Sequence, residues 1–499
     1  MEGVVLAVLD GIGIREEAEG NAFLQAETPT LDRLFAGEPY TELAAYGEAV
    51  GLPDGYIGNS EVGHLHLGAG RVIPQELVRI NKAIEDGSLF ENEALQEAAE
   101  QVEENDGTVH VMGIASDGGV HGHLDHLLAL IKFFAGEGLD VTVHAFLDGR
   151  DVPPTSADTY QQRIEEQADD LGTGHVASFM GRYYAMDRDQ NWERTERAYR
   201  CLVDGDGRTV GSVEEGMERA YEEDRNDYFV EPTIIEDRFE PVEEGDAVVF
   251  SNYRKDRARQ LSRAFVQDGF DRFDTLPPED TAFVSMMPYA DAFDNPTVFE
   301  EQRVEDTLGE VLSRNGVEQL RLSESQKEPH VTYFFDGQRE EQFPGTDVTI
   351  FASADVPSYD EKPEMEADRV TDAAVAAEDR EYGFVLINYP NCDLVGHTGD
   401  VDAAVKAVET VDAMVARLEE TARENGYALI LTSDHGTCEE MVGQYETSHT
   451  LNRVPFCIVN GGDIGDLSDG GLSNIAATVL ALLDIEPPEA MDAPLFSQE

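Results

Sequence analysis

Short apolar runs alternate with longer stretches of helical periodicity along the whole chain. The runs predict β-strands at Val4–Leu9, Thr108–Ile114, Val141–Phe146, Ala247–Ser251, Phe384–Asn388, Ala428–Thr432 and Pro455–Val459. Apolar positions three and four residues apart predict helices at His123–Phe134, Arg194–Val203, Asp306–Ser313, Val401–Glu424 and Leu472–Leu483. Strands that alternate with helices form parallel sheets with helices on both faces, so the pattern predicts an α/β fold.

Acidic side chains follow three of these strands, at the point where each strand ends. Asp10 follows the first strand, Asp393 the fifth and Asp434 the sixth. In open α/β sheets, functional groups gather at the carboxyl ends of the strands. Because Asp10 lies near the N-terminus and the other two in the last quarter, we expect both chain ends to form one domain. The middle is then an inserted α/β domain, and the predicted segments are 1–74, 75–299 and 300–499.

The charge balance is strongly acidic. The 499 residues include 103 Asp and Glu against 35 Lys and Arg, which gives a formal net charge of −68, and only six of the basic residues are Lys. The acids are spread through periodic sequence rather than gathered in a tail. Nucleic acid is excluded as a partner, because binding a phosphate backbone needs a basic footprint. An evenly acidic surface stays soluble in molar salt, where the screening length is about 3 Å, so we expect a halophilic protein.

The sequence indicates a cytoplasmic protein without a membrane segment. No apolar run approaches the roughly 20 residues of a membrane span. The first apolar run is preceded by Glu2, where a signal peptide carries positive charge, and is interrupted by Asp10. The four cysteines have no paired spacing, which favours a reducing compartment; they are Cys201, Cys392, Cys438 and Cys457.

The second half of the chain carries metal-ligand residue types in loop contexts. They are Asp393, His397, Asp434, His435 and His449. Imidazole combined with carboxylate suits Mn, Zn, Fe or Co, and is less natural for Mg or Ca. A single such histidine is more often an ordinary polar residue, but five such residues together with Asp10 favour a metal centre. His64 and His66 alternate in GHLHLGAG, and we expect them to satisfy backbone groups rather than to bind metal.

A glycine-rich segment surrounds Ser60. Residues 51–71 read GLPDGYIGNSEVGHLHLGAGR, so the backbone can come close to a bound group. A helix that begins at Ser60 would stabilise a phosphate with its first amides, and a nearby metal would activate the hydroxyl as a nucleophile. The alternative is a glycine-rich turn in which Ser60 serves only as the N-cap of a helix.

Arginines are grouped in loop motifs of the middle segment. The motifs are SDGGVHGHLDH with His121, FLDGRDVPPTS with Arg150 and Asp151, GRYYAMDRD with Arg182 and Arg188, and NYRKDRAR with Arg254 and Arg257. Arginine binds carboxylates and phosphates bidentately. Any one of these arginines alone would be read as half of a surface ion pair. Together, in a chain with so few basic residues, they favour an anion-binding site.

These segments together resemble the cofactor-independent phosphoglycerate mutases of the alkaline-phosphatase-like superfamily. The resemblance spans nearly the whole chain, and its most specific parts are GNSEVGHLHLGAGR, SDGGVHGH, HAFLDGRDVPP, GRYYAMDRD and NYRKDRAR. It implies an alkaline-phosphatase-like metal domain formed by both chain ends and an inserted phosphotransferase domain.

The resemblance also implies site residues. One metal site would be formed by Asp393, His397 and His449, and the other by Asp10, Ser60, Asp434 and His435. Substrate would be held by His121, Arg150, Asp151, Arg182, Arg188, Arg254, Arg257 and Lys327. Two positions depart from the family pattern without removing a ligand: Thr437 stands where the family usually has Asn, and Lys255 where it usually has Pro.

The implied reaction interconverts 3-phosphoglycerate and 2-phosphoglycerate, in glycolysis and gluconeogenesis, without 2,3-bisphosphoglycerate. The phosphate would pass through a phosphoserine at Ser60, with Asp151 handling the proton of the attacking hydroxyl. Two Mn²⁺ are the expected cofactors, and Co²⁺ or Mg²⁺ would also suit. Because the reaction needs no partner chain, we expect a monomer.

Three other functions compete with this interpretation. A metal-dependent phosphatase would share Asp10 and Ser60 but would not need the middle arginines. A phosphopentomutase would share the metal residues, whereas the motifs from Arg150 to Arg257 match the glycerate enzyme. A non-catalytic binding protein would be favoured only if Ser60 or a ligand were missing, and none is.

Overall fold

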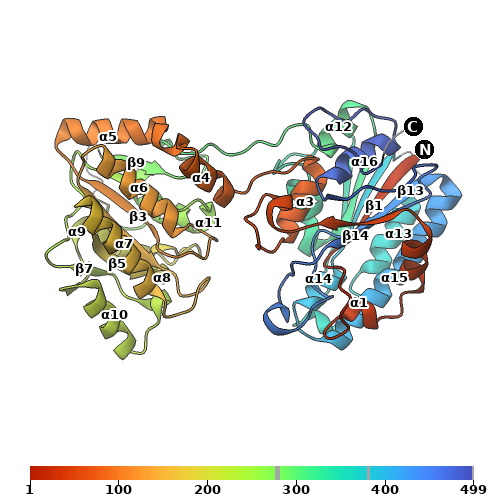
Figure 1. Ribbon diagram of the computed structural model, residues 1–499, viewed down its shortest axis with the longest axis horizontal. Helices are drawn as coiled ribbons and strands as arrows, with labels where there is room; N and C mark the ends of the chain where they lie inside the picture. Colours follow the sequence, from red (N-terminus) through yellow and green to blue (C-terminus); the bar gives the residue numbers. More distant parts are fainter. Residues whose placement is uncertain (276–280, 379–381, 497–499) are drawn as a thin grey trace. The chain divides into compact units, whose positions relative to one another are not determined.

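A computed structural model describes residues 1–275, 281–378 and 382–496. The chain forms two compact units (Figure 1), Met1–Gln75 with Arg303–Glu499, and Glu76–Gln302. We call them the terminal unit and the middle unit. The terminal unit is therefore built from both chain ends. Within the described residues, no helix is both long enough and apolar enough to cross a membrane.

The terminal unit contains an eight-stranded sheet in the order β11-β10-β12-β1-β13-β14-β2-β15. Its strands are β1 (Gly3–Leu9), β2 (Tyr40–Ala44), β10 (Gln319–Glu324), β11 (Thr346–Phe351), β12 (Phe384–Tyr389), β13 (Tyr427–Thr432), β14 (Val454–Val459) and β15 (Gly470–Gly471). Its helices are α1 (Ala22–Gln25), α2 (Pro29–Gly37), α3 (Ser60–Ala69), α12 (Leu308–Arg314), α13 (Ala367–Glu378), α14 (Asn391–Gly396), α15 (Val401–Asn425) and α16 (Asn474–Leu482).

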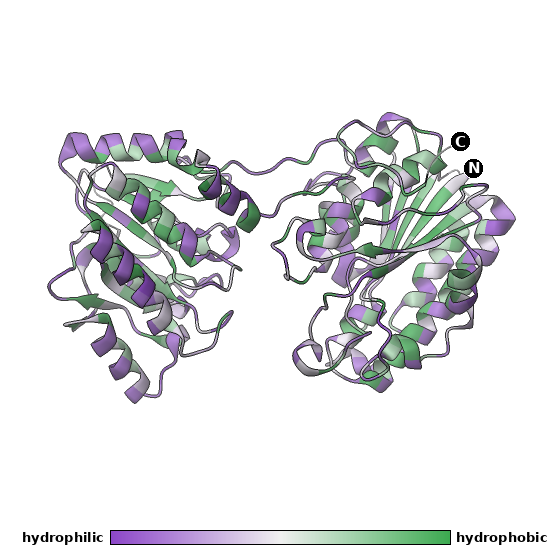
Figure 2. Ribbon diagram, in the orientation of Figure 1, coloured by the Kyte–Doolittle hydropathy of each residue, from purple (hydrophilic) through white to green (hydrophobic). Residues whose placement is uncertain are grey.

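Helices cover both faces of this sheet, which explains why its central strand is apolar at every position. Alternate residues of a strand point to opposite faces. In β1, Val5 and Ala7 enter a core beneath α13 and α15, whereas Val4 and Leu6 enter a core beneath α12 and α16. Figure 2 shows the hydrophobic strands between helices whose outer faces are hydrophilic. Most of the acidic residues therefore lie on the solvent side of an ordinary apolar core.

The middle unit contains a seven-stranded sheet in the order β6-β7-β5-β4-β3-β8-β9. Its strands are β3 (Val109–Ile114), β4 (Val141–Leu147), β5 (Val176–Gly181), β6 (Arg208–Val210), β7 (Thr233–Ile235), β8 (Ala247–Phe250) and β9 (Ala282–Ser285). Its helices are α4 (Glu76–Glu85), α5 (Glu93–Asn105), α6 (Leu124–Gly136), α7 (Ala157–Leu171), α8 (Arg182–Ala185), α9 (Trp192–Asp204), α10 (Val213–Glu222) and α11 (Lys255–Val266).

The α/β fold and all the named strands and helices are confirmed, but the expectation of purely parallel sheets is wrong at two places. Strand β14 runs antiparallel to β13 and to β2, and β7 runs antiparallel to β5. No crossover helix lies between β13 and β14, so residues 433–453 stay at one edge of the sheet. This connection carries three of the predicted metal ligands.

Candidate active site

The acidic side chains that follow strands of the terminal unit converge, as the topology requires. Asp10 follows β1, Asp434 follows β13, and Asp393 lies in α14 just after β12; all three are buried. Because β14 is antiparallel to β13, the connection between them brings His449 back to the same edge. Residues separated by more than 400 positions in the sequence thereby meet at the carboxyl ends of neighbouring strands.

Asp393, His397 and His449 form a compact triangle of ligand atoms. The Oδ1 atom of Asp393 lies 3.2 Å from Nε2 of His397 and 3.3 Å from Nε2 of His449, and the two Nε2 atoms are 3.1 Å apart. Ligand atoms that share one cation at about 2.0–2.2 Å lie roughly 3–3.5 Å from each other. The spacing of this triangle fits one cation.

Backbone carbonyls fix the orientation of both imidazoles. Nδ1 of His397 donates to the carbonyl of Thr447, and Nδ1 of His449 donates to the carbonyl of Gly58, each at 2.9 Å. A carbonyl can only accept, so the protons of the neutral rings lie on Nδ1 and the Nε2 lone pairs face Asp393. Two lone pairs and a carboxylate that point at one position attract a cation.

A second set of ligand atoms surrounds Nε2 of His435. This atom lies 3.4 Å from Oδ1 of Asp10, 3.6 Å from Oδ2 of Asp434 and 2.8 Å from Oγ of Ser60. Asp10, Asp434 and His435 are buried, and within the described part of the chain the carboxylate oxygens of Asp434 have ionic neighbours but no well-formed hydrogen bond. An unsatisfied buried carboxylate is costly, so this donor set also fits a cation. His435 Nε2 is 3.8 Å from Asp393 Oδ1, so the two sets adjoin.

Lys327 lies at the centre of these carboxylates. Its Nζ atom donates to Ser60 Oγ at 2.6 Å and contacts Asp393 Oδ2 at 2.7 Å and Asp10 Oδ2 at 2.9 Å. Burial alone would lower the pKa of Lys327, but the carboxylates of Asp10 and Asp393 outweigh burial and raise it. The family resemblance implied that Lys327 binds substrate; the structure places it against Ser60 and both ligand sets.

The same carboxylates act on His435 and on each other. Burial would lower the pKa of His435, yet Asp434 and Asp10 raise it to about 10. Burial would raise the pKa of Asp434, but His435 and Lys327 lower it. Positive charge is therefore favoured throughout this cluster, whether it comes from a lysine, an imidazolium or a metal ion.

Ser60 is the first residue of α3 rather than its cap. Asn59 is the N-cap, and its side chain accepts from the amide of Val62, so the capping role considered for Ser60 belongs to its neighbour. The helix can approach Asp434 closely because residue 63 is glycine: a Cβ there would lie 2.6 Å from the carbonyl oxygen of Asp434. The start of a helix favours anions, and here it presents the serine hydroxyl.

His64 and His66 both contact backbone carbonyls, as expected, and in a helix they do not share a face. His66 donates from Nδ1 to the Val62 carbonyl at 2.7 Å and accepts at Nε2 from the Ile73 amide at 3.0 Å. His64 is different, because its Nδ1 also lies 3.2 Å from Asp434 Oδ2. Asn388 contacts both His64 Nε2 at 3.1 Å and Asp10 Oδ2 at 2.7 Å. Asn388 lies inside an apolar strand, a position that sequence patterns assign to the core.

The substrate-binding candidates of the middle unit follow four adjacent strands. The segments that follow β3, β4, β5 and β8 carry these candidates: His121, Arg150 with Asp151, Arg182 as the first residue of α8, and Arg254 with Arg257 at the start of α11. Arg182 is almost fully buried, and one of its nitrogens donates to both Asp148 and Asp151. Asp148 also accepts from Ser116 Oγ at 2.7 Å and from the Asp151 amide at 3.0 Å. Sequence reasoning missed Asp148, although LDGRD places it two residues from Arg150.

A second charged group in the middle unit is centred on Asp256, which the sequence analysis also missed. It contacts Arg188 at 2.6 Å, Arg254 at 3.4 Å and His121 at 3.5 Å. Burial would raise the pKa of Asp256, but these three partners lower it. Arg257 is buried and donates to the Met186 carbonyl at 3.0 Å. The exposed arginines are Arg150, Arg188 and Arg254, whose guanidinium groups are accessible to an anion.

Both departures from the family pattern have local explanations. Thr437 Oγ1 lies 3.2 Å from Asp393 Oδ1 and 3.2 Å from His435 Nδ1, so a polar side chain still contacts both ligand sets. Lys255 is the first residue of α11, where proline is favoured but not required, and it forms an exposed ion pair with Glu301.

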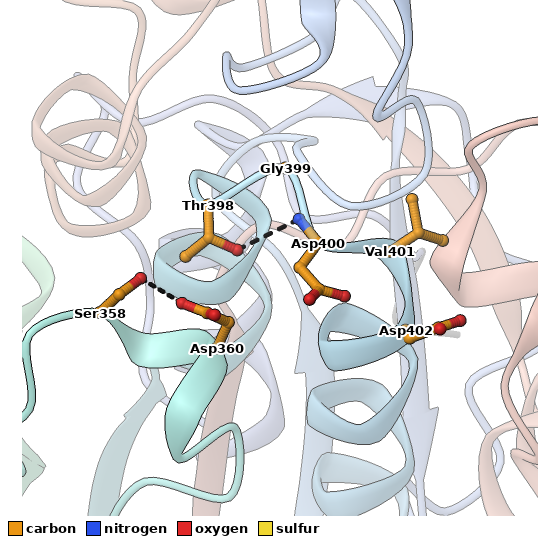
Figure 3. A pocket seen from close by; sticks show the side chains of 7 residues that line it. All are labelled: Ser358, Asp360, Thr398, Gly399, Asp400, Val401 and Asp402. Carbon is orange, nitrogen blue, oxygen red and sulfur yellow. Dashed lines mark hydrogen bonds between the residues drawn. The ribbon is translucent and has the colours of Figure 1, made fainter.

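A pocket of about 740 Å³ is lined by residues 398–402, which follow His397 in the sequence, and by Ser358 and Asp360, but its chemistry does not suit a phosphate ester. Figure 3 shows its lining, which includes the carboxylates of Asp360, Asp400 and Asp402. Asp400 is the N-cap of α15 and accepts from the Ala403 amide, so its role is structural. Negative charge around this pocket disfavours an anionic substrate.

Comparisons with known proteins match both units. The family model described as BPG-independent PGAM N-terminus matches residues 80–291, and the model for type I phosphodiesterase / nucleotide pyrophosphatase matches residues 300–454. The 2,3-bisphosphoglycerate-independent phosphoglycerate mutase of Moorella thermoacetica is 49% identical over 98% of this chain and 97% of its own. That of Salinibacter ruber is 46% identical over 98% and 96%.

A solved structure matches the chain over its full length. The phosphoglycerate mutase of Leishmania mexicana, determined at low cobalt concentration, is 33% identical, with a TM-score of 0.73, and covers 100% of this chain and 98% of that one. The similarity therefore extends over both units and includes every segment that carries a candidate residue.

Proposed function

The chain belongs to the 2,3-bisphosphoglycerate-independent phosphoglycerate mutases, isomerases that interconvert 3-phosphoglycerate and 2-phosphoglycerate, and we propose that it transfers the phosphate through a phosphoserine at Ser60. The proposal rests on the surroundings of the hydroxyl oxygen of Ser60. Ser60 Oγ lies 2.6 Å from Lys327 Nζ and 2.8 Å from His435 Nε2, at the start of α3. A hydroxyl in such a cationic environment is suited to attack a phosphate.

Divalent cations are part of the proposal. Asp393, His397 and His449 would hold one, and Asp10, Ser60, Asp434 and His435 the other. Bound there, they would neutralise charge on the phosphate oxygens and on the serine oxygen. The nitrogen and carboxylate donors suit Mn²⁺ or Co²⁺, and two Mn²⁺ are our choice; Mg²⁺ is the less natural alternative.

The chain's own residues account for the covalent steps. Ser60 Oγ attacks phosphorus, the bond from phosphorus to O3 breaks, and O3 takes up a proton while the serine loses one. Lys327 donates to Ser60 Oγ and so stabilises negative charge on it. In the second step O2 attacks phosphoserine and loses its proton, and the serine oxygen leaves with the electron pair. We propose that Asp151 exchanges these protons at the glycerate hydroxyls.

The middle unit would retain glycerate between the two steps. Arg150, Arg188 and Arg254 are exposed, and Asp256 orients two of them. Arginines held by a common carboxylate present a fixed fork to an anion, which lowers the entropic cost of binding. His121, Arg182 and Arg257 are buried behind them, so we propose that they orient the binding groups as well as bind substrate.

The competing functions are not favoured. Relatives that match 98% of the chain are named phosphoglycerate mutases rather than phosphatases or phosphopentomutases. We also propose that the enzyme is a monomer, because the chemistry needs no partner chain. The net charge of −68 leads us to propose that it works in a cytoplasm of high salt.

Trapping the intermediate tests the proposal. Parent protein mixed with phosphate-labelled 3-phosphoglycerate and quenched in acid should carry label on Ser60, located by peptide mapping. Ser60→Ala should keep its melting temperature and lose mutase activity. Label on a histidine, or mutase activity in the alanine variant, would rule out the serine route.

A further inference from the structure

Glu439 is a buried carboxylate with no part in the chemistry described above. It is completely buried and accepts four hydrogen bonds. Oε2 accepts from the amides of Gly13 at 3.0 Å and Thr437 at 2.9 Å. Oε1 accepts from the hydroxyl of Thr450 and from Asn452 Nδ2 at 3.0 Å. None of these four donors is charged.

The four donors come from three separate segments, each of which carries proposed ligands. Gly13 lies three residues after Asp10, Thr437 two residues after His435, and Thr450 directly after His449. Glu439 therefore connects three of the segments that contribute ligands to the two cation sites. The backbone joins the same segments, because the amides of Thr437 and Cys438 donate to the Gly11 carbonyl at 3.0 and 3.1 Å.

The neighbourhood is packed tightly around this carboxylate. A Cβ at residue 436 would lie 2.3 Å from Oε1 of Glu439, so glycine at this position allows the backbone to approach the carboxylate closely. The Thr450 hydroxyl, besides donating to Glu439, accepts from the Asn452 amide at 3.3 Å. The carboxylate thus has one fixed position: Oε2 faces the donors of Gly13 and Thr437, and Oε1 faces those of Thr450 and Asn452.

We propose that Glu439 is a positioning residue that sets the spacing of the ligand-bearing segments in both cation sites. The inference rests on the proposed function, because the ligands are those assigned there. A carboxylate can accept from donors at both oxygens, whereas a glutamine of nearly the same shape would turn an NH₂ group toward donors at one end. The mismatch would displace at least one segment and so misplace its ligand.

Loss of such an outer contact typically weakens metal binding by about 10- to 100-fold. Glu439→Gln should therefore bind Mn²⁺ about 10- to 100-fold more weakly than the parent. The KM for 3-phosphoglycerate, measured at saturating Mn²⁺, should stay within about twofold, because no substrate contact is removed. A residue that only stabilised the fold would leave the Mn²⁺ affinity of the folded protein unchanged.

The experiment measures Mn²⁺ binding to metal-free full-length protein by electron paramagnetic resonance of the free ion, without substrate. The matched control is Asp412→Asn. Asp412 is also a buried carboxylate of the terminal unit and accepts hydrogen bonds from the amides of Thr30 and Leu31, and among the described residues it has no hydrogen bond to a ligand-bearing segment. The Asp412→Asn variant should be less stable than the parent and should bind Mn²⁺ with the same affinity as the parent.

Two further variants decide the matter if Glu439→Gln does not fold. Thr450→Val and Asn452→Ala each remove one donor to Oε1, and each should weaken Mn²⁺ binding several-fold, by less than the glutamine variant. Parent-like affinity in folded Glu439→Gln, or in both single-donor variants, would overturn the proposal. A parent that binds no Mn²⁺ would overturn the proposed cation sites and this inference together, whereas parent binding with an unaffected variant overturns the inference alone.

Discussion

Replacing Lys327 with methionine separates the charge of this side chain from its volume. In the structure Nζ lies within 2.9 Å of Asp10 and Asp393, both of which are buried, and of Ser60, the proposed nucleophile. Methionine fills similar space but leaves these two carboxylates without their shared cation. The substitution should therefore destabilise the metal-free protein much more than a typical surface change.

The size of the effect follows from the burial. Removing one partner of a buried ion pair costs about 3–5 kcal/mol, because the other charge remains buried. For a folding unit larger than 150 residues, 1 kcal/mol shifts the melting temperature by about 2 °C or slightly more. We therefore expect Lys327→Met to melt about 6–10 °C below the parent in chelator. Activity should also fall, by about 10²–10³ in kcat, because a donor to the serine oxygen is lost.

Mn²⁺ should narrow the difference in melting temperature between Lys327→Met and the parent. Cations bound by the same carboxylates would compensate the lost lysine charge, so saturating Mn²⁺ should raise the melting temperature of Lys327→Met more than that of the parent. The assay is a set of thermal melts in EDTA and in Mn²⁺ at constant KCl. Lys362→Met is the matched control: Lys362 pairs with Glu366 at 2.7 Å on the surface, where a pair contributes at most about 1 kcal/mol.

Two outcomes would refute this reasoning. Equal melting temperatures of Lys327→Met and Lys362→Met in EDTA would show that the buried carboxylates do not depend on Lys327. A Mn²⁺-induced rise no larger in Lys327→Met than in the parent would show that the cations do not bind where the lysine charge acts.

Three further predictions concern the middle unit, acid stability and salt. Arg254→Ala and Arg257→Ala should lower mutase activity more than phosphoserine formation, with a larger share of phosphate released to water; normal mutase activity in both would assign the middle unit another role. Burial lowers the pKa of His66 to about 4, so the neutral ring supports the fold above about pH 6.5, and up to about 3 kcal/mol of stability is lost as the pH falls toward 4. The free energy of unfolding, measured with urea between pH 4 and 7, should therefore fall less with decreasing pH in His66→Gln than in the parent. The same pH dependence in both proteins would contradict this. Stability and kcat/KM should both rise from about 0.05 M to about 2 M KCl, because salt screens the net charge of −68 from itself and from the anionic substrate; equal melts and rates at both concentrations would show that the charge is not a salt adaptation.

Several largely apolar strands were predicted from the sequence even where they contain polar residues, as β3 and β4 do, whereas a strand with a buried charge was not. Strand β1 is apolar at every position, and it was recognised. Strand β10 was missed because it contains Gln319 and Arg321, both buried. Arg321 lies over the rings of Phe335 and Phe384 and pairs with Asp336. Periodicity cannot reveal a buried arginine, because its burial depends on partners from other elements.

The residues of the candidate site likewise differ in whether a sequence pattern pointed to them. Three of the predicted metal ligands, Asp10, Asp393 and Asp434, were singled out because each is an acid shortly after an apolar run. Asn388 and Glu439 lacked that signal, since one lies within a strand and the other lies among many surface acids in the sequence. What distinguishes Glu439 from the other acids is complete burial against four donors, and three of those donors come from positions that only the fold brings together.

The contrast between surface and site explains how so acidic a chain can handle an anionic substrate. Where chemistry is proposed, buried carboxylates are compensated by specific cations: Lys327 lies among Asp10 and Asp393, and Arg182 lies between Asp148 and Asp151. Elsewhere, exposed acids interact mainly with water and salt ions, which screen them beyond about 3 Å at 1 M salt. Buried pairs are screened much less than exposed charges, so the field inside the site should persist at the salt concentration that weakens the field outside. High salt would then remove the long-range repulsion between the surface and the substrate while leaving the local attraction for phosphate. At high salt the sign of the surface charge would therefore no longer matter for substrate binding at this site.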